Sequence, residues 1–407
     1  MNPESSSGNA GITPAEAKRN FFVVCFALTF CFVVYSMLIV AVPVYTLRLG
    51  ASPLILGSVL SAQYLLPLVC AIPLGGVVTR YGGRVTLIVG AVIMVAGLLA
   101  MHFWPGYGGL VTGQLLVGLA HLQMVLSAQT IISNLGTGPV LERYFGWYAT
   151  WLSGGQVVGP LLAGALLDKT QGAGQVFLAM AGFALLAAIA GFWLTGQARE
   201  RMSVERKETG FRAQWALLLG NRGVQLSVMV TVLGMFALGV YGSYLPAYLE
   251  SLEMSAVVIG VLVSLRAGVS MLIRPFIARL ISAVGGREPA LLLSLGTLSV
   301  GLLLLGISGQ VVFIGMLSVL VGIGAGLTQP LSMVVLAESV DKARRAGALG
   351  MRLMANRAVH FLAPLAFGAV LELGGFGLAF ALSGLGVGVA AVYLFRFLRR
   401  QGTDIRA

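Results

Sequence analysis

Long apolar stretches, separated by short segments that contain glycine, proline or charged residues, cover almost the whole chain. Each stretch is close to the roughly 20 residues that an α-helix needs to cross ~30 Å of hydrocarbon. The pattern predicts twelve membrane-spanning helices, near residues 21–46, 54–78, 85–103, 110–133, 145–167, 174–196, 222–249, 256–280, 289–307, 310–335, 346–371 and 375–398. The chain is therefore expected to be an all-α polytopic membrane protein.

A polar segment near the midpoint divides these helices into two sets. Residues 197–214 are rich in Arg and Glu, and we interpret them as a cytoplasmic linker. The predicted domains are two six-helix bundles, residues 18–196 and 215–400. Residues 1–17, rich in Ser, Gly and Pro, are expected to form a disordered N-terminal tail, and residues 401–407 form the C-terminal tail.

The composition supports a membrane protein and excludes a soluble one. Hydrophobic residues occupy 58% of the 407 positions and charged residues only 10%, whereas soluble domains carry about 25% charged residues. The sequence has no phosphate-binding loop with Lys and Ser or Thr, and no cluster with metal-ligand spacing. An enzyme, an ATP-driven pump, a bound metal and a cofactor are therefore not expected.

The net charge of +12 at first suggests an acidic partner such as nucleic acid. The positions of the basic residues favour another explanation. Most of the 26 Lys and Arg residues fall in the tails, the linker and alternate loops, while the opposite loops carry Arg48 and Lys169. By the positive-inside rule both termini are expected in the cytoplasm, and no nucleic-acid partner is expected.

The two predicted bundles resemble each other in sequence at a nearly constant offset. Matching pairs are Pro43 and Pro246, Tyr45 and Tyr248, Gly57 and Gly260, Ser61 and Ser264, Gly118 and Gly322, Pro160 and Pro364, and Asp168 and Glu372. Single coincidences mean little in a glycine-rich apolar chain, but these pairs keep one order. Two parallel repeats are typical of transporters whose halves move about a site at mid-membrane.

The segment after the second apolar stretch contains Gly75, Arg80, Gly82 and Arg84. This spacing resembles a loop motif of the major facilitator superfamily, and the resemblance extends over essentially the full chain. It implies the major facilitator fold, with twelve helices in two pseudo-symmetric six-helix bundles, and a gating role for these four residues. Thr79 stands where the family usually has Asp, the residue that helps to latch the two halves together.

The fifth apolar stretch carries Gly155, Gly159, Pro160 and Gly164. Their spacing is similar to a motif of the exporters in that superfamily, mainly the drug/proton antiporters, and it implies a conformational role for these residues. Gly155 and Gly159 also form a small-xxx-small face that permits close helix packing, and Pro160 can bend the helix. Packing alone is the alternative explanation of this motif.

Four arginines fall inside the predicted helices: Arg266, Arg274, Arg352 and Arg357. A charge at the bilayer centre costs roughly 3 kcal/mol, so such residues usually face a cavity or a partner. Arg266 and Arg357 lie near the middle of their helices and are expected to face a central cavity, with Arg352 nearer the cytoplasm. A hydrogen-bonded network that holds helices together is the alternative for the eleventh helix.

Neutral polar and aromatic residues are expected to complete a substrate site with these arginines. They are Gln63, Tyr64, His121, Gln129, Tyr241, Gln329 and His360. No Asp or Glu is predicted near mid-membrane, so the unpaired arginines favour an anionic substrate. Proton coupling, if present, is assigned to His121 and His360, because histidine titrates near neutral pH.

These features predict a monomeric secondary active transporter that works by alternating access in a bacterial cytoplasmic membrane. The leading hypothesis is export, driven by an ion gradient, of a small organic anion, zwitterion or amphipathic metabolite, with a siderophore or a drug as candidates. Three alternatives stay open: import of an anionic nutrient, flipping of a lipid or lysolipid, and a membrane sensor without transport. The expected partners are the small molecule, protons as a candidate coupling ion, and the lipid bilayer.

Overall fold

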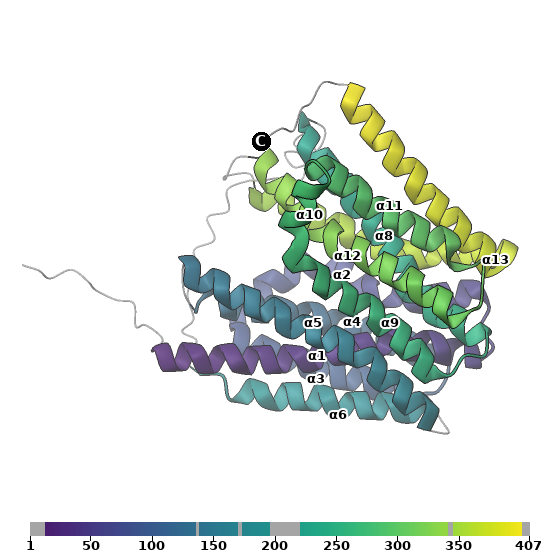
Figure 1. Ribbon diagram of the computed structural model, residues 1–407. Coiled ribbons are helices and arrows are strands. Elements are labelled where there is room, and N and C mark those ends of the chain that lie inside the picture. Colours follow the sequence, from purple (N-terminus) through teal and green to yellow (C-terminus); the bar gives the residue numbers. More distant parts are fainter. Residues whose placement is uncertain (1–12, 136–137, 170–172, 196–219, 341–344, 401–407) are drawn as a thin grey trace, which may run out of the picture.

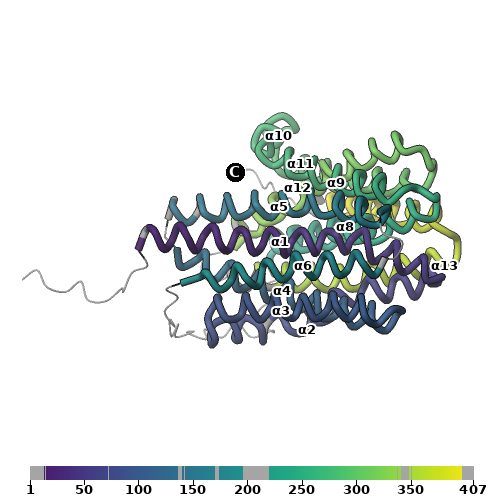
Figure 2. Tube along the Cα trace, turned by 90° about the horizontal axis from the view of Figure 1, so that it is seen from below, coloured from purple at the N-terminus to yellow at the C-terminus, as the bar shows by residue number. Residues whose placement is uncertain are grey.

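The computed structural model describes residues 13–135, 138–169, 173–195, 220–340 and 345–400. The described chain consists of long helices in two bundles, one formed by the N-terminal half and one by the C-terminal half (Figure 1). Most helices run roughly along one common direction in both views, as expected for helices that cross a single layer (Figure 2). The predicted linker, residues 197–214, and the predicted C-terminal tail lie outside the described residues.

Both bundles contain the predicted succession of helices. The N-terminal bundle consists of α1 (Pro14–Arg48), α2 (Pro53–Tyr81), α3 (Gly83–Phe103), α4 (Tyr107–Ser133), α5 (Gly138–Lys169) and α6 (Ala173–Phe192). The C-terminal bundle consists of α8 (Arg222–Ser251), α9 (Ala256–Ile273), α10 (Ile277–Ala283), α11 (Arg287–Leu305), α12 (Val311–Ser339) and α13 (Arg345–Arg400). The all-α fold with two bundles is confirmed.

Helix α13 contains the last two predicted spans. Its 56 residues would extend over ~84 Å at 1.5 Å per residue, far more than one bilayer. Helical geometry fails at Gly374 and Gly375, where φ is −151° and 72°. The positive φ of Gly375 is readily accessible only to glycine, so the chain turns back here and begins a second span.

Two predicted boundaries are corrected. The single helix expected at 256–280 is divided by a 3-10 turn at Arg274–Phe276, because Pro275 has no N–H to continue the helical hydrogen bonds. Helix α1 begins at Pro14, within the segment predicted as a disordered tail. Thr13 and Glu16 form a capping box there, which satisfies free N–H groups at the helix start.

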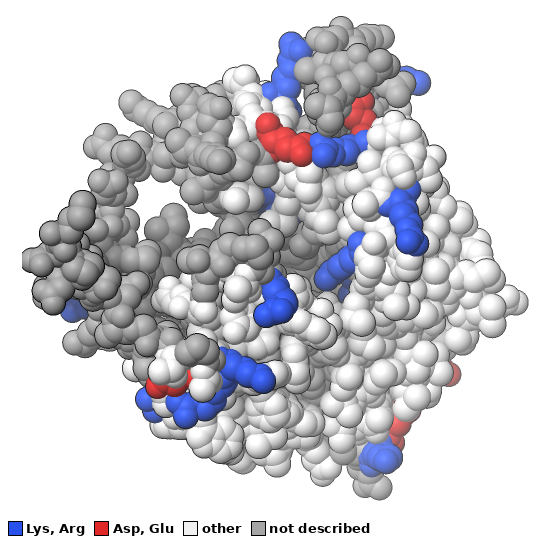
Figure 3. All heavy atoms as spheres, turned by 60° about the vertical axis from the view of Figure 1, so that its left-hand side comes forward, with Lys and Arg blue, Asp and Glu red and all other residues white. Residues whose placement is uncertain are grey.

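The outer surface is largely apolar, as a lipid-facing surface must be. Large apolar side chains such as Val69, Phe103, Val312 and Leu373 are more than half exposed. A broad area of the face in Figure 3 carries no charged side chain. Exposed apolar surface of this extent is unfavourable in water and indicates contact with lipid.

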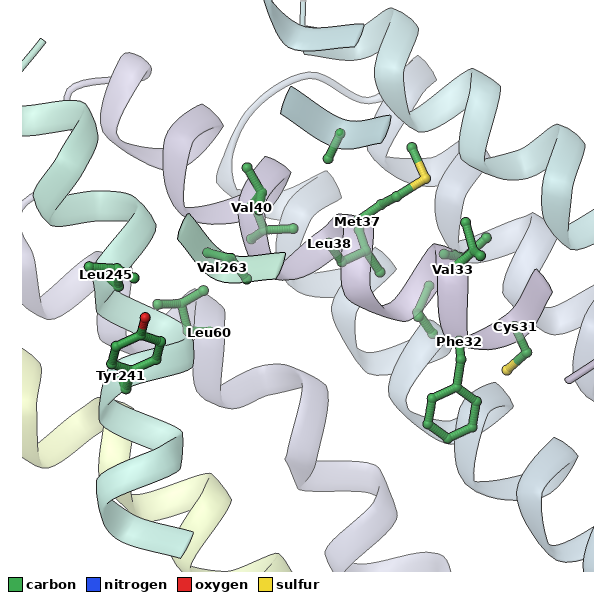
Figure 4. Close-up of a cluster of buried hydrophobic side chains, with 14 of the residues drawn as sticks. Cys31, Phe32, Val33, Met37, Leu38, Val40, Leu60, Tyr241, Leu245 and Val263 are labelled. Atoms are coloured by element: carbon green, nitrogen blue, oxygen red, sulfur yellow. The ribbon is translucent and has the colours of Figure 1, made fainter. Parts of the chain in front are cut away.

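Buried apolar side chains continue from one bundle into the other. Figure 4 shows Met37 and Leu38 of α1 in one cluster with Leu60 of α2, Tyr241 of α8 and Val263 of α9. The helices at the interface therefore pack on each other directly. Helices α2 and α13 form one such pair, α5 and α9 form another, and α1 also contacts α8.

One end of the molecule, which we call the Asp168 end, carries four acidic side chains: Asp168, Glu250, Glu253 and Glu372. Here the carboxylate of Asp168 at the end of α5 accepts hydrogen bonds from the N–H groups of Ala256 and Val257, at 2.9 and 3.1 Å. The carboxylate of Glu372 on α13 accepts one from the N–H of Leu54, at 3.3 Å. Each carboxylate thus caps a helix of the other bundle, where the positive end of the helix dipole favours an anion.

An ion pair and two glycines hold the bundles together at the same end. Arg48 on α1 and Glu250 on α8 form an ion pair with an N–O distance of 2.7 Å. Gly57 on α2 lies so near α13 that an added Cβ would be 2.6 Å from the carbonyl oxygen of Pro364. Gly260 on α9 is packed against the carbonyl of Pro160 in the equivalent way. The two bundles are therefore closed against each other at the Asp168 end.

Candidate substrate cavity

A cavity of about 270 Å³ lies between the two bundles. Its lining residues include Tyr35, Gln63, Tyr64, Gln114 and Gln156 from the N-terminal bundle, and Met235, Arg266, Ser270, Arg274, Gln329 and His360 from the C-terminal bundle. Arg274 and Gln329, both nearer the end opposite Asp168, have exposed side chains. The cavity is therefore reached from that end, which we call the linker end.

Arg266 is the central basic residue of this lining. Its guanidinium lies over the ring of Tyr241, with Cζ 5.8 Å from the ring centre, and its Nε atom has no hydrogen-bond partner. The ring of Tyr241 is fully buried and is fixed by a 2.7 Å hydrogen bond that its hydroxyl donates to Ser318. The two ion pairs among the described residues, Arg48 with Glu250 and Arg287 with Glu338, do not include Arg266.

Ser270 on α9 and Arg274, the first residue after α9, continue the polar face of Arg266 toward the linker end, because residues four apart lie on one side of a helix. Arg274 donates a 3.3 Å hydrogen bond from Nη1 to the Ser153 hydroxyl on α5. This bond connects the two bundles beside the cavity. Arg274 therefore both lines the cavity and connects the two bundles.

Arg357 is placed differently from the prediction, because it is not among the lining residues of the cavity. Its positive charge acts on four neighbouring rings, those of Tyr35, Tyr64, His121 and His360. Of these rings, Tyr35, Tyr64 and His360 line the cavity. Arg357 therefore lies near these rings without lining the cavity itself, and its charge still influences the site.

These rings form a continuous series across the two bundles. His121 stacks on Tyr35 with ring centres 4.1 Å apart, and Tyr64 stacks on His360 at 5.0 Å. The Tyr35 hydroxyl donates a 3.3 Å hydrogen bond to the Tyr64 hydroxyl and so joins the two stacks. Because His360 belongs to α13 and the other rings to the N-terminal bundle, relative movement of the bundles must change the Tyr64–His360 contact.

Arg352 is also outside the cavity lining, contrary to the prediction that it belongs to the substrate site. Its side chain is buried between α8 and α12, where it donates to the hydroxyls of Thr231 and Ser332 at 3.0 and 2.9 Å. A further bond reaches the Gln329 carbonyl at 3.4 Å. The alternative explanation of this arginine, a network that holds helices together, agrees with these contacts.

The predicted neutral residues are divided between the cavity and its surroundings. Gln63, Tyr64, Gln329 and His360 line the cavity. His121 and Tyr241 are buried behind it, each against a lining residue. Gln129 is exposed on α4 and is not among the lining residues. Gln129 lies in the last turns of α4, nearer the linker end, which accounts for its place outside the lining.

The loop motif lies at the linker end of the N-terminal bundle. Gly82 ends α2 with φ of 82°, a left-handed conformation that favours glycine. Arg84 donates a 3.0 Å hydrogen bond to the carbonyl of Phe192, and Arg80 lies over the ring of Tyr81. Thr79 donates back to the carbonyl of Gly75 in its own helix at 3.0 Å. This bond is local to α2, so Thr79 does not supply the carboxylate with which the family's Asp helps to latch the two halves together.

The α5 motif is a packing face in this structure. A Cβ at Gly155 would be 2.8 Å from the carbonyl oxygen of Thr29 on α1, and one at Gly159 would be 2.7 Å from Cβ of Ser36. Gly164 is packed against the carbonyl of Ala256 in the other bundle. These glycines allow α5 to contact α1 and α9 closely, as small residues do in membrane proteins.

Sequence reasoning missed Tyr35 as a site residue, although it lines the cavity and connects the two ring stacks. A usable signal was present, because Tyr35 and Ser36 are adjacent polar residues in a long apolar stretch. Within the described residues, no group of three or more His, Cys, Asp or Glu is placed to hold a metal ion. The described lining of the cavity carries two arginines and no acidic side chain.

Comparisons with known proteins agree with this architecture. The family model described as Major Facilitator Superfamily matches residues 24–314 and 228–406. An uncharacterized MFS-type transporter from Methanocaldococcus jannaschii is 20% identical over 336 residues, which is 81% of this chain and 85% of that protein.

Several solved structures share the fold at low sequence identity. The nucleoside transporter NupG has a TM-score of 0.80 and 14% identity, over 93% of this chain and 99% of that chain. A POT family transporter in complex with 5-aminolevulinic acid has a TM-score of 0.74 and 14% identity, covering 95% and 97%. A bacterial homolog of the human lysosomal transporter Spinster, in an inward-facing and unoccupied conformation, has a TM-score of 0.73 and 13% identity, covering 96% of each chain. By the family model and this fold, the chain belongs to the major facilitator superfamily and is a membrane transporter.

Proposed function

We propose that this transporter carries a small organic anion or zwitterion through the cavity between its bundles, with Arg266 as the main anion-binding group. The observation that supports the proposal is the charge of the lining. Arg266 and Arg274 line the cavity, and no Asp or Glu is among its lining residues. A substrate that carries a carboxylate or phosphate therefore compensates a charge that the protein leaves without an ion-pair partner.

The surroundings of Arg266 favour an anion that presents two oxygens to the guanidinium. The stacking of its guanidinium on the buried ring of Tyr241 limits the directions in which its N–H groups point. A guanidinium held in this way offers a forked set of donors that matches the two oxygens of a carboxylate or phosphate. The proposal agrees with the POT family transporter in complex with 5-aminolevulinic acid, since that ligand is a small carboxylic acid.

We propose that the linker end faces the cytoplasm, which makes this an inward-facing conformation. Described basic residues at that end include Arg80, Arg84, Arg143, Arg222 and Arg279, and the Asp168 end carries Arg48 and Lys169. Basic side chains are also more frequent than acidic ones on the face in Figure 3. The positive-inside rule then supports a cytoplasmic position for both termini, and we propose a bacterial inner membrane as the location.

Export in exchange for an ion is the direction that the α5 motif favours, and import on the same fold is the alternative. Close packing on α1 and α9 accounts for Gly155, Gly159 and Gly164, so the direction must be measured. Efflux and uptake in right-side-out and inside-out vesicles, with and without a proton gradient, distinguish export from import. Loss of gradient-driven transport in His360→Gln, with substrate exchange retained, would assign proton coupling to this histidine.

The proposed substrate class is tested by ligand-induced thermal stabilisation of the purified protein with a panel of anionic metabolites. Compounds that stabilise the wild-type protein should fail to stabilise Arg266→Gln. The matched control is Arg80→Gln, which removes an exposed arginine outside the cavity and should leave stabilisation unchanged. An anion that stabilises Arg266→Gln as well as the wild type would contradict the assigned role of Arg266.

A further inference from the structure

The wall of the cavity opposite Arg266 contains two buried glutamines with unsatisfied amide atoms. Gln63 on α2 is 6% exposed and Gln114 on α4 is 1% exposed, and both line the cavity. The Nε2 donor of Gln63 and the Oε1 acceptor of Gln114 have no hydrogen-bond partner. Buried polar groups are nearly always paired, so two such atoms in one wall need an explanation.

The fold places these two glutamines in one wall of the cavity. The backbone carbonyl of Gln63 packs directly against Gly118, where a Cβ has no room. Gln114 precedes Gly118 by one helical turn and therefore lies on the same side of α4. The close approach of α2 to α4 thus puts both amides into the part of the lining that the N-terminal bundle contributes.

The two walls of the cavity differ in kind. The C-terminal bundle contributes guanidinium groups, Arg266 and Arg274, whereas the N-terminal bundle contributes neutral amides, Gln63, Gln114 and Gln156. A neutral donor and a neutral acceptor in one wall match a group that has an acceptor and a donor of its own. Amides, lactams and ureas have this arrangement, while a simple carboxylate or an alkyl chain does not.

We infer that the substrate carries, besides its anionic group, a neutral amide-type group that binds between Gln63 and Gln114 while the anion binds Arg266. The inference rests on the proposed function, because it assumes the anion site on α9. The cavity of about 270 Å³ is at the lower end of the range for small-molecule sites, which favours a small substrate with one group at each wall.

A series of three carboxylates of equal size tests the inference. N-acetylglycine has the amide, 4-oxopentanoate keeps the acceptor but lacks the donor, and 4-methylpentanoate lacks both. We expect the wild-type protein, studied by titration calorimetry, to bind N-acetylglycine at least tenfold more tightly than 4-methylpentanoate, with 4-oxopentanoate between them. N-acetylglycinamide, which lacks the carboxylate, should bind at least tenfold more weakly than N-acetylglycine.

Variants assign the preference to the two glutamines. Gln63→Met and Gln114→Met should each reduce the preference for N-acetylglycine to less than threefold, while 4-methylpentanoate binds as in the wild type and so reports an intact fold. Gln129→Met, which alters an exposed glutamine of α4 outside the cavity, should keep the full preference.

Each other outcome overturns a defined part of the argument. Equal binding of the three carboxylates by the wild type, with binding lost in Arg266→Gln, refutes the amide subsite and leaves the proposed function in place. An unchanged preference in both methionine variants shows that the glutamines bind only water, and also refutes the subsite. Binding of none of the carboxylates, or binding that does not depend on Arg266, refutes the anion site and with it the proposed function.

Discussion

The two carboxylates that cap helices across the interface predict how the Asp168 end opens. When the bundles separate there, Asp168 loses two hydrogen bonds from backbone N–H groups and Glu372 loses one. The perturbation is Asp168→Asn together with Glu372→Gln, which removes both charges and leaves the shape of the side chains nearly unchanged. The closed arrangement should then become less favourable relative to the open one.

The magnitude follows from the number and kind of these bonds. A hydrogen bond to a charged group contributes about 1.5–3 kcal/mol, and the helix dipole adds about 0.3–1 kcal/mol. An amide retains part of each bond, so we expect a loss of about 1–2 kcal/mol for Asp168→Asn and about 0.5–1 kcal/mol for Glu372→Gln. The two sites share no partner, and their effects should add to about 1.5–3 kcal/mol, a shift of roughly 10- to 150-fold in the equilibrium constant.

The assay measures how often the cavity opens at the Asp168 end. Leu60 lines the cavity and is 6% exposed, so Leu60→Cys is a suitable reporter after Cys25, Cys31 and Cys70 are replaced by alanine. A membrane-impermeant maleimide is added to right-side-out vesicles, where it reaches this position only in the open arrangement. The labelling rate is then proportional to the open population, and it follows the equilibrium constant as long as the open arrangement is the minor state.

A matched control separates the capping effect from a general change of surface charge. Glu253 is an exposed carboxylate at the same end, and Glu253→Gln should leave the labelling rate unchanged. The double variant should label roughly 10- to 150-fold faster than the parent, as this shift of the equilibrium constant requires. A rate within twofold of the parent, or an equal increase in Glu253→Gln, would refute the reasoning.

Three further predictions follow from the packing of named residues. Gly57→Val and Gly260→Val should each raise the same labelling rate at least tenfold, because a side chain there meets the backbone of Pro364 or Pro160. The control is Gly76→Val, where space is open, and it should leave the rate unchanged. Unchanged rates in Gly57→Val and Gly260→Val would contradict the packing argument. Arg352→Ala should lower stability by about 2–3 kcal/mol in thermal unfolding, because a buried charged donor with three acceptors is lost, and ligand binding by the folded variant should persist. Tyr64→Leu should slow transport severalfold while equilibrium binding at Arg266 changes less than threefold, because the stack of Tyr64 on His360 crosses the moving interface. Equal loss of binding and transport would argue against a role of this stack in the movement.

Much of the fold is readable from the sequence, because each helix must by itself satisfy its backbone hydrogen bonds in lipid. The requirement forces long apolar stretches, and these predict the spans and the two bundles. The sequence repeat also anticipated contacts across the interface. Gly57 and Gly260 match in the repeat, as do Pro160 and Pro364, and in the structure each glycine packs on the proline of the other bundle.

The site was less predictable, because a charge inside a helix does not say which neighbour it faces. Arg266 and Arg352 both lie in apolar stretches, but Arg266 lines the cavity and Arg352 is enclosed between α8 and α12. Their difference depends on helix rotation and on the hydroxyls of Thr231 and Ser332, which come from other helices. Tyr35 was missed for the same reason, since its partners His121 and Tyr64 belong to α4 and α2.

The sequence alone determined that this chain crosses a membrane many times, that it contains two related halves, and that its interior has basic charge without matching acid. These properties are set by hydrophobicity and charge along the chain, which do not depend on how the helices pack. Only the tertiary structure decided which polar residues share one cavity and which carboxylates cap which helices. Both depend on the rotation and depth of helices far apart in sequence, and these are fixed by contacts between side chains that no local pattern specifies.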